Sequence, residues 1–248
     1  MKKLIAILAI VFCTSAAFAQ LQYSAHIAGN MPLGDFGRSS GDTWSCLNGG
    51  RYAIEGNAAF GFGVGAKVKY SFEIEDLAVD ALGAIATVDM FYNFVDDDFS
   101  YFQKEDHYSI DAPQYINIPI MVGANYKMDM TSSIALYFEA ALGLNIRIIG
   151  DYEAHGYDND CVFSDLAEYY KVTREYDPSC SFAFQLGVGA VFLNKFSAGL
   201  HYYYLGGAQV HYDYYKTYPF YDDNHWNSVK TSNKLKTNML VLRLGYHF

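Results

Sequence analysis

The chain has 248 residues, of which 52% are hydrophobic, 17% aromatic and only 18% charged. A soluble domain averages about 25% charged residues, so this composition favours a protein that places much of its surface against something other than water. The formal net charge of −10 argues against nucleic acid as a partner, because phosphate binding requires clustered Lys and Arg side chains.

The first residues have the pattern of a secretory signal peptide. Lys2-Lys3 precede an apolar run from Leu4 to Phe12, and the small-x-small site Ala17-Phe18-Ala19 follows. We therefore expect residues 1–19 to be cleaved after export and residues 20–248 to form one domain.

An unusually long alternating segment, IALYFEAALGLNIRIIG, lies at 134–150. Its even positions are all apolar, whereas Glu139, Asn145 and Arg147 interrupt the odd positions. A period of two is the signature of a strand, and the charges disfavour a membrane-spanning helix. A tilted strand needs about 9–11 residues to cross the hydrocarbon of a bilayer. The segment is therefore predicted to be a spanning strand with its even face toward lipid.

The same alternation recurs along the chain. The other predicted strands are 22–31, 57–74, 77–94, 115–127, 182–192, 196–208 and 240–248. Short connections near 75–76, 129–132 and 193–195 alternate with long polar ones at 32–56, 95–113, 151–179 and 211–236. This pattern predicts an all-β fold, a closed antiparallel transmembrane β-barrel of about eight strands with short periplasmic turns and long extracellular loops. Such barrels lie in the outer membrane of Gram-negative bacteria.

The competing fold is a soluble up-and-down barrel of the lipocalin type. Its outer face would carry many charges, but the non-apolar face here is mostly Gly, Ala, Ser and Asn. Aromatic residues also gather near both ends of the predicted apolar face, which is typical of membrane interfaces. Examples are Tyr70, Phe72, Tyr126, Phe196 and Tyr246 at one end, and Tyr92, Phe94, Tyr202 and Tyr204 at the other.

Three segments, YINIPIMVGANYK, SFAFQLGVGAVFLNKFSAGLHYYYLG and NMLVLRLGYHF, resemble the PorT-like outer-membrane β-barrel domain of Bacteroidota. The early MPLGDFG also resembles members of that group. The resemblance covers most of the mature chain outside the long loops. It implies a fold and a location, and it suggests a role as an accessory of an envelope secretion system.

The chain ends on alternating apolar and aromatic residues, Leu242, Leu244, Tyr246 and Phe248. This ending is similar to the C-terminal signal by which outer-membrane barrels are recognised for insertion. It implies the barrel-assembly machinery as a partner. The same residues would also face lipid in the last strand.

A barrel of about eight strands has an interior that side chains just fill. The predicted lumen charge network consists of Lys67, Lys69, Asp89, Glu139, Arg147, His201 and Arg243. Counting residues from the short turns predicts a lower cluster centred on Glu139 and an upper pair of Asp89 with Arg147. Because unpaired charge in a narrow lumen is costly, we expect a filled, charge-paired lumen. A conducting or proton-relaying lumen is the alternative.

The long loops carry acidic runs, VDDDF at 95–99 and DYEAHGYDND at 151–160, and a tyrosine-rich run at 211–221. Clustered carboxylates of this kind could bind calcium or magnesium through oxygen ligands, but they match no EF-hand spacing, and solvated acidic loops are the expectation. No HExxH zinc motif is present, and neither a metal nor another cofactor is expected. No nucleophile motif is present either, and we expect no enzymatic activity. Cys161 and Cys180 are candidates for a loop disulfide, with Cys46 left over.

These observations predict a non-enzymatic outer-membrane barrel, embedded in outer-membrane lipid, whose role is structural or is recognition of an extracellular protein or glycan through acidic, Tyr-rich loops. The alternatives are a small-solute channel or transport barrel and an accessory component of a secretion system.

Overall fold

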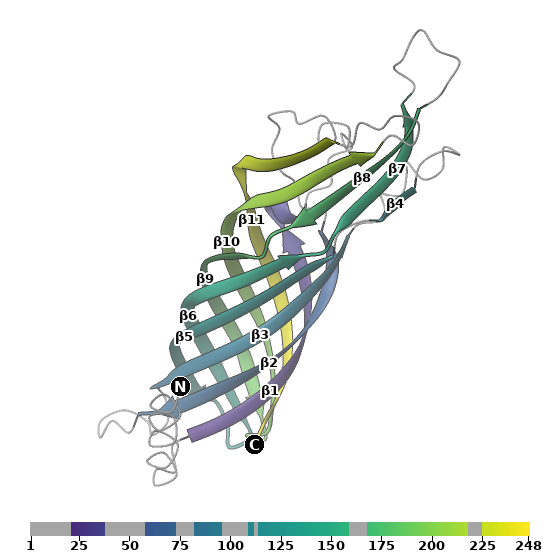
Figure 1. The fold of residues 1–248 in the computed structure, drawn as a ribbon. Helices are drawn as coiled ribbons and strands as arrows, with labels where there is room; N and C mark the ends of the chain where they lie inside the picture. Colours follow the sequence, from purple (N-terminus) through teal and green to yellow (C-terminus); the bar gives the residue numbers. More distant parts are fainter. Residues whose placement is uncertain are drawn as a thin grey trace, which may run out of the picture.

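Eight long strands form a closed antiparallel barrel in the computed structural model (Figure 1). The structure describes residues 21–37, 58–72, 82–95, 109–111, 114–158, 168–217 and 225–248. The barrel strands are β1 (Leu21–Leu33), β2 (Ala58–Ser71), β3 (Leu82–Val95), β5 (Tyr115–Asp129), β6 (Ile134–Ile149), β9 (Ser179–Phe192), β10 (Phe196–Thr217) and β11 (His225–His247). The wall closes because β11 pairs with both β10 and β1. The predicted fold class is confirmed.

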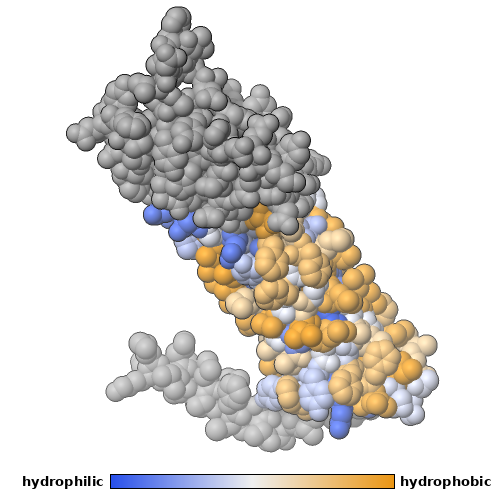
Figure 2. All heavy atoms as spheres, turned by 90° about the vertical axis from the view of Figure 1, so that its right-hand side faces the viewer, coloured by the Kyte–Doolittle hydropathy of each residue, from blue (hydrophilic) through white to orange (hydrophobic). Residues whose placement is uncertain are grey.

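The alternation in the sequence sorts side chains between the two faces of the wall. In β6, Leu142 and Leu144 are 58% and 56% exposed, whereas Glu139 and Arg147 are 3% and 1% exposed. The other barrel strands show the same pattern. Figure 2 shows apolar side chains covering much of the barrel wall on the face in view. The barrel therefore has an apolar outer wall and a largely polar lining.

Three further strands extend the sheet beyond the barrel. The outer part of β10 pairs with β8 (Glu168–Tyr176), β8 pairs with β7 (Tyr152–Asp158), and β7 pairs with β4 (Ser109–Asp111). We call these three strands, together with β10 from Gly207 onward and β11 up to Lys236, the surface sheet (Figure 1).

The surface sheet corrects the prediction that 151–179 and 211–236 are loops. Both segments contain strands, and β10 and β11 extend well past the predicted strand ends at 208 and 240. The prediction was wrong because it required an apolar face. Two strands can pair through their backbone hydrogen bonds even when polar residues lie on both faces. The run HYDYYKT in β10 has no apolar face of this kind.

The surface sheet begins at a bend in β10 and β11 (Figure 1). The register of the pair shifts between Tyr204 and Gly207, and Gly206 has a φ of 75°. This left-handed backbone suits glycine, which has no Cβ to clash. An extra residue of this kind is a β-bulge, which bends a strand and increases its twist.

In the part of the chain that the structure describes, no helix is both long and apolar enough to cross a membrane. The helical segment found there is the short 3-10 turn η1 (Gly34–Phe36), which follows β1.

The turn between β9 and β10 carries backbone strain that a substitution can relieve. Leu193 and Asn194 have φ values of 53° and 55°, and leucine in this region costs roughly 1 kcal/mol or more. Asparagine tolerates the conformation, so we expect Leu193→Asn to raise the free energy of unfolding by about 0.5–1 kcal/mol. Urea titration of the refolded barrel measures this change. Leu193→Ala keeps the strain and should give no gain; an equal gain from alanine would contradict the explanation.

Candidate functional site

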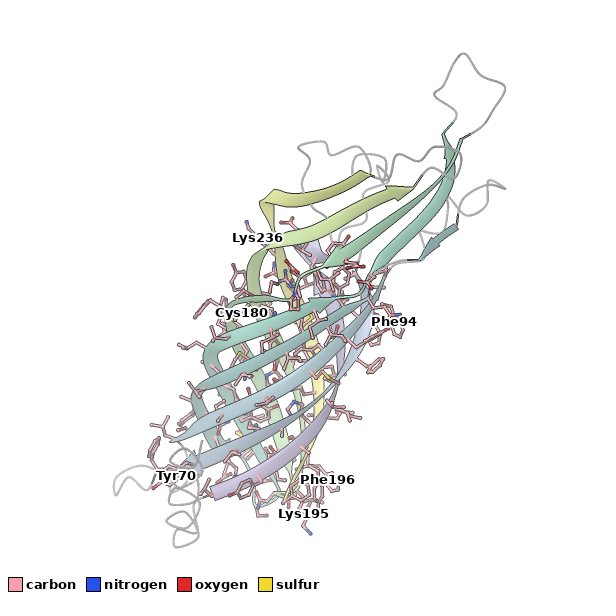
Figure 3. The ribbon with its side chains drawn as sticks, in the orientation of Figure 1. Tyr70, Phe94, Cys180, Lys195, Phe196 and Lys236 are labelled. Carbon is pink, nitrogen blue, oxygen red and sulfur yellow. The ribbon has the colours of Figure 1, made fainter. Side chains whose placement is uncertain are left out.

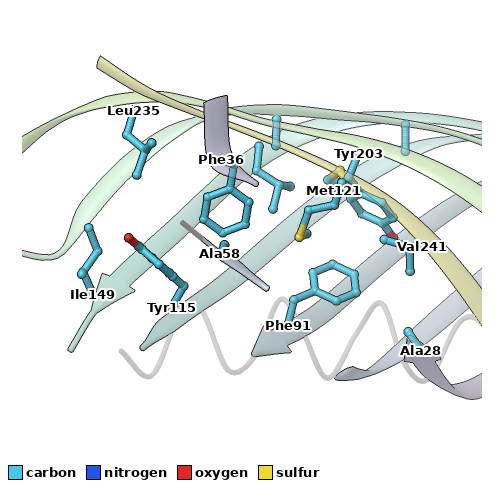
Figure 4. Packing of buried hydrophobic residues seen from close by; sticks show 14 of the residues in the cluster. Ala28, Phe36, Ala58, Phe91, Tyr115, Met121, Ile149, Tyr203, Leu235 and Val241 are labelled. Atoms are coloured by element: carbon cyan, nitrogen blue, oxygen red, sulfur yellow. The ribbon is translucent and has the colours of Figure 1, made fainter. Parts of the chain in front are cut away.

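The lumen is filled by two sets of side chains, and the first is apolar. We call it the apolar layer: Phe36, Phe91, Tyr115, Met121, Tyr203, Leu205, Leu235, Met239 and Val241. Phe36, Phe91 and Tyr203 are all 0% exposed. The ring of Phe91 packs edge-on against Tyr203 with centroids 5.0 Å apart, and Phe36 packs in the same way on Tyr115 at 5.1 Å (Figure 4).

Phe36 was not predicted to line the lumen. It comes from η1, where the chain leaves β1 and turns inward at Gly34, whose φ is 60°. Figure 4 shows its ring among Tyr115, Ala58 and other members of the cluster from β2, β5 and β11. Strand periodicity ends before Phe36, so alternation could not predict its position. The segment MPLGDFG stood out only through the family resemblance.

The second set is polar and is built around two buried carboxylates. Asp89 accepts hydrogen bonds from Arg243 Nη2 at 2.7 Å and from the Tyr203 hydroxyl at 3.0 Å. Its other oxygen lies 2.6 Å from His26 Nε2. Three strands besides its own therefore hold one carboxylate that is 1% exposed.

Glu139 is the second carboxylate. Its Oε1 accepts hydrogen bonds from Lys67 Nζ and from Asn125 Nδ2, the latter at 3.1 Å. Its Oε2 lies 3.9 Å from Arg243 Nη1 and 4.0 Å from His201 Nδ1. Arg243 thus lies between Glu139 and Asp89 and links the two carboxylates, with their partners, into one set of contacts that we call the polar network.

The structure places every residue of the predicted charge network in the lumen. Lys67, His201 and Arg243 lie around Glu139 as expected, and Lys69 is 6% exposed on the same lining. The sequence reasoning did not place His26 or Tyr203 beside Asp89. Both alternate inward in their strands, but strand periodicity does not specify a partner.

The predicted pairing of Asp89 with Arg147 is wrong. Asp89 binds Arg243 instead, and Arg147 donates from Nη1 to the Leu235 carbonyl at 3.1 Å and from Nη2 to the Gly206 carbonyl at 3.3 Å. Counting residues from the nearest turn assumes that strands run straight up the barrel. Barrel strands are tilted and staggered, so equal counts on distant strands do not give equal depth.

Glycine at position 65 makes room for the Asp89 contacts. Gly65 is the register partner of both His26 and Asp89, on either side of it. A Cβ at this position would overlap Asp89 Oδ1 and His26 Nε2, the two atoms that contact each other. The network therefore requires a residue without a side chain between its members.

We accordingly expect Gly65→Ala to lower the free energy of unfolding by about 1–3 kcal/mol, as overpacking of a filled core does. The measurement is urea titration of the refolded barrel. Gly29→Ala is the matched control, because its Cβ would meet only the Phe60 ring, at 3.1 Å. Equal effects of the two substitutions would contradict the role given to Gly65.

The remaining predicted residues lie outside the lumen. Leu242, Leu244, Tyr246 and Phe248 are 40–79% exposed at alternate positions, on the outer wall and at the chain end. Cys180 has a free thiol and is exposed. Cys46 and Cys161, like the acidic run at 95–99 apart from Val95, lie outside the described residues, so the disulfide stays a prediction. Among the residues that the structure describes, no group of three His, Cys, Asp or Glu side chains could hold a metal ion.

The strand pairing and the filled lumen define a small closed β-barrel with an apolar outer wall. No protein-family model matches the chain, and no curated protein matches it. Solved structures similar to it include Neisserial surface protein A, at 16% identity, 92% coverage of this chain, 95% coverage of that chain and a TM-score of 0.45. OprG from Pseudomonas aeruginosa has 12% identity, coverages of 93% and 96%, and a TM-score of 0.44. Ail of Yersinia pestis has 14% identity, coverages of 92% and 98%, and a TM-score of 0.40.

By name, the Neisserial protein is a surface protein, OprG is an outer membrane protein and Ail is an attachment invasion locus protein. At these identities and TM-scores the likeness carries no argument about this chain. The PorT-like resemblance also stays a prediction, because no family model matches.

Proposed function

We propose that this protein is a non-enzymatic outer-membrane β-barrel whose lumen is sealed and whose surface sheet recognises an extracellular protein or glycan. The surface sheet is the observation that carries the proposal. Short connections would suffice for a barrel that only seals its own lumen. Here β10 and β11 continue as a paired hairpin, and β8, β7 and β4 pair in turn alongside β10. Ordering so many residues costs conformational entropy, and a preformed recognition surface is a function for which such ordering is useful.

The outer wall supports the membrane location. Large apolar side chains are exposed on every barrel strand, far more than a soluble monomer presents to water. Aromatic pairs lie near both ends of this wall: Phe196 with Tyr246 near the short turns, and Phe184 with Tyr204 toward the surface sheet. Figure 3 shows Tyr70, Lys195 and Phe196 near one end of the barrel, and Phe94, Cys180 and Lys236 toward the other. Such aromatic girdles are typical of membrane interfaces.

The C-terminal residues support the proposed partner in insertion. Leu242, Leu244 and Tyr246 share the outer face of β11 and therefore present one continuous apolar edge before Phe248. On this proposal the barrel-assembly machinery recognises this edge first, and outer-membrane lipid covers it afterwards.

A small-solute channel is the alternative function, and the polar lining around Glu139 is the observation that favours it. The apolar layer opposes it, because its buried rings and aliphatic side chains fill the lumen, and the Tyr203 hydroxyl within it is already hydrogen-bonded to Asp89.

The recognition role is tested with a trimmed barrel. Short turns replace residues 152–176 and 209–234, which keeps Leu235 of the apolar layer, and refolding is verified by the heat-dependent shift in gel mobility. Wild type and the trimmed barrel are then compared on arrays of glycans and extracellular matrix proteins. We expect at least one ligand that wild type binds and the trimmed barrel binds at least tenfold more weakly. The control variant Asp129→Asn, at the opposite end of the barrel, should bind like wild type. Equal binding by wild type and trimmed barrel, or no ligand for either, would overturn the proposal.

A further inference from the structure

Arg147 is a buried cation with no carboxylate beside it among the side chains that the structure describes. It is 1% exposed, and it donates hydrogen bonds to the Leu235 and Gly206 carbonyls. No Asp or Glu whose side chain the structure describes lies within 4.0 Å of it, and its Nε has no hydrogen-bond partner among those side chains. A buried charge of this kind is costly unless an opposite charge accompanies it.

A second unpartnered donor lies next to it. Asn117 is the direct register partner of Arg147 across β5 and β6, and it is 0% exposed. Its Oδ1 accepts a hydrogen bond from Asn145 Nδ2 at 3.0 Å, which leaves its own Nδ2 as a donor without a partner in the described structure. Directly opposed residues have Cβ atoms about 4.5–5.5 Å apart, so the two donors share one small region of the lumen.

Among the side chains that the structure describes, the charges of the lumen leave a positive excess at this place. The buried carboxylates of the described lining are Asp89 and Glu139, and they already contact Arg243 and Lys67. Arg147 lies apart from that network, above it on β6, at the level where β10 and β11 bend. An uncharged water would satisfy the two donors but would leave the positive charge uncompensated.

We propose that Arg147 Nε and Asn117 Nδ2 bind a small monovalent anion of the chloride class. Both atoms donate, and the acceptor of the same amide, Asn117 Oδ1, is already occupied by Asn145 Nδ2. The anion holds the guanidinium in one orientation, in which its other two nitrogens donate hydrogen bonds to the carbonyls of Gly206 and Leu235. Because these carbonyls lie where β10 and β11 bend, anion binding stabilises the base of the surface sheet. Anion binding in the wall of the barrel does not depend on what the surface sheet recognises.

The test compares urea unfolding of the full-length refolded protein in sodium chloride and in sodium gluconate, at equal ionic strength and pH. At a chloride concentration ten times its dissociation constant, the folded-to-unfolded ratio should be about tenfold higher in chloride than in gluconate. Lys127→Gln, which removes a cation from the periplasmic end, is the control and should keep the full difference. Equal ratios for wild type in the two salts would overturn the proposal.

Asn117→Asp is the decisive variant because it keeps the shape of the side chain and supplies a negative charge beside Arg147. We expect it to refold and to lose the difference between chloride and gluconate, since the carboxylate takes the place of the anion. Crystals of wild type soaked in bromide should show an anomalous peak beside Arg147 Nε, and the same soak of Asn117→Asp should show none. An undiminished chloride effect in Asn117→Asp, or no bromide beside Arg147 in wild type, would contradict the assignment.

Discussion

Replacing Asp89 by alanine should lower the free energy of unfolding by about 3–5 kcal/mol, the range expected when one partner of a buried ion pair is removed. The substitution leaves the Arg243 guanidinium without the acceptor that it contacts at 2.7 Å, and the Tyr203 hydroxyl without the one at 3.0 Å. It also removes the partner of His26. Urea titration of the barrel refolded into lipid vesicles measures the loss.

The matched control is Asp129→Ala at the short-turn end. The Asp129 side chain is 63% exposed and lies 3.3 Å from Lys127, so its removal should cost less than about 1 kcal/mol. Asp89→Asn, which retains the shape and one acceptor, should fall between the two. Similar losses for Asp89→Ala and Asp129→Ala would mean that the polar network does not stabilise the barrel.

Replacing Phe91 by alanine should cost a similar amount, about 3–5 kcal/mol, for a different reason. The ring is 0% exposed and packs edge-on against Tyr203, so its removal leaves a cavity in the apolar layer and loses contacts that no rearrangement of a closed wall restores. The same titration measures the change.

Phe196→Ala serves as the control for this prediction. The Phe196 ring is 53% exposed on the outer wall, where lipid can fill the space that the ring leaves. Its loss should cost clearly less than that of Phe91. A larger loss at Phe196 would show that the outer wall, and not the apolar layer, dominates the stability of the barrel.

The eight-stranded wall could be predicted because its signal is local. In β6 every even position is apolar and every charge is odd, so the direction of each side chain followed from a period of two. The surface sheet was missed because β7, β8 and the outer part of β10 have no apolar face. Their pairing depends on backbone hydrogen bonds and on the neighbouring strands, which a local pattern does not reveal.

The lumen was predictable in its members but not in its pairs. Glu139, Arg147 and Arg243 were assigned to the inner face from alternation, and they lie there. Which of them meet depends on the tilt and stagger of the strands, so Arg243 and not Arg147 binds Asp89. The position of Phe36 depends on a turn outside any strand, and periodicity carries no information about it.

The lumen contains two sets of buried side chains, the polar network and the apolar layer, and each has a different effect. The polar network holds opposite walls together through charge-assisted hydrogen bonds, which are stronger than neutral ones. The apolar layer fills the lumen on the side toward the surface sheet with buried rings and aliphatic side chains. On this account the apolar layer is the barrier to ions, and the polar network mainly stabilises the wall.

Conductance of the refolded wild-type protein in a planar lipid bilayer tests the sealed lumen most directly. We expect no steady current from wild type, and a leak from the double variant Phe36→Ala/Phe91→Ala, which opens the apolar layer, provided that gel mobility shows this variant to be folded. A steady single-channel current from wild type would contradict the sealed lumen and make a channel the leading function.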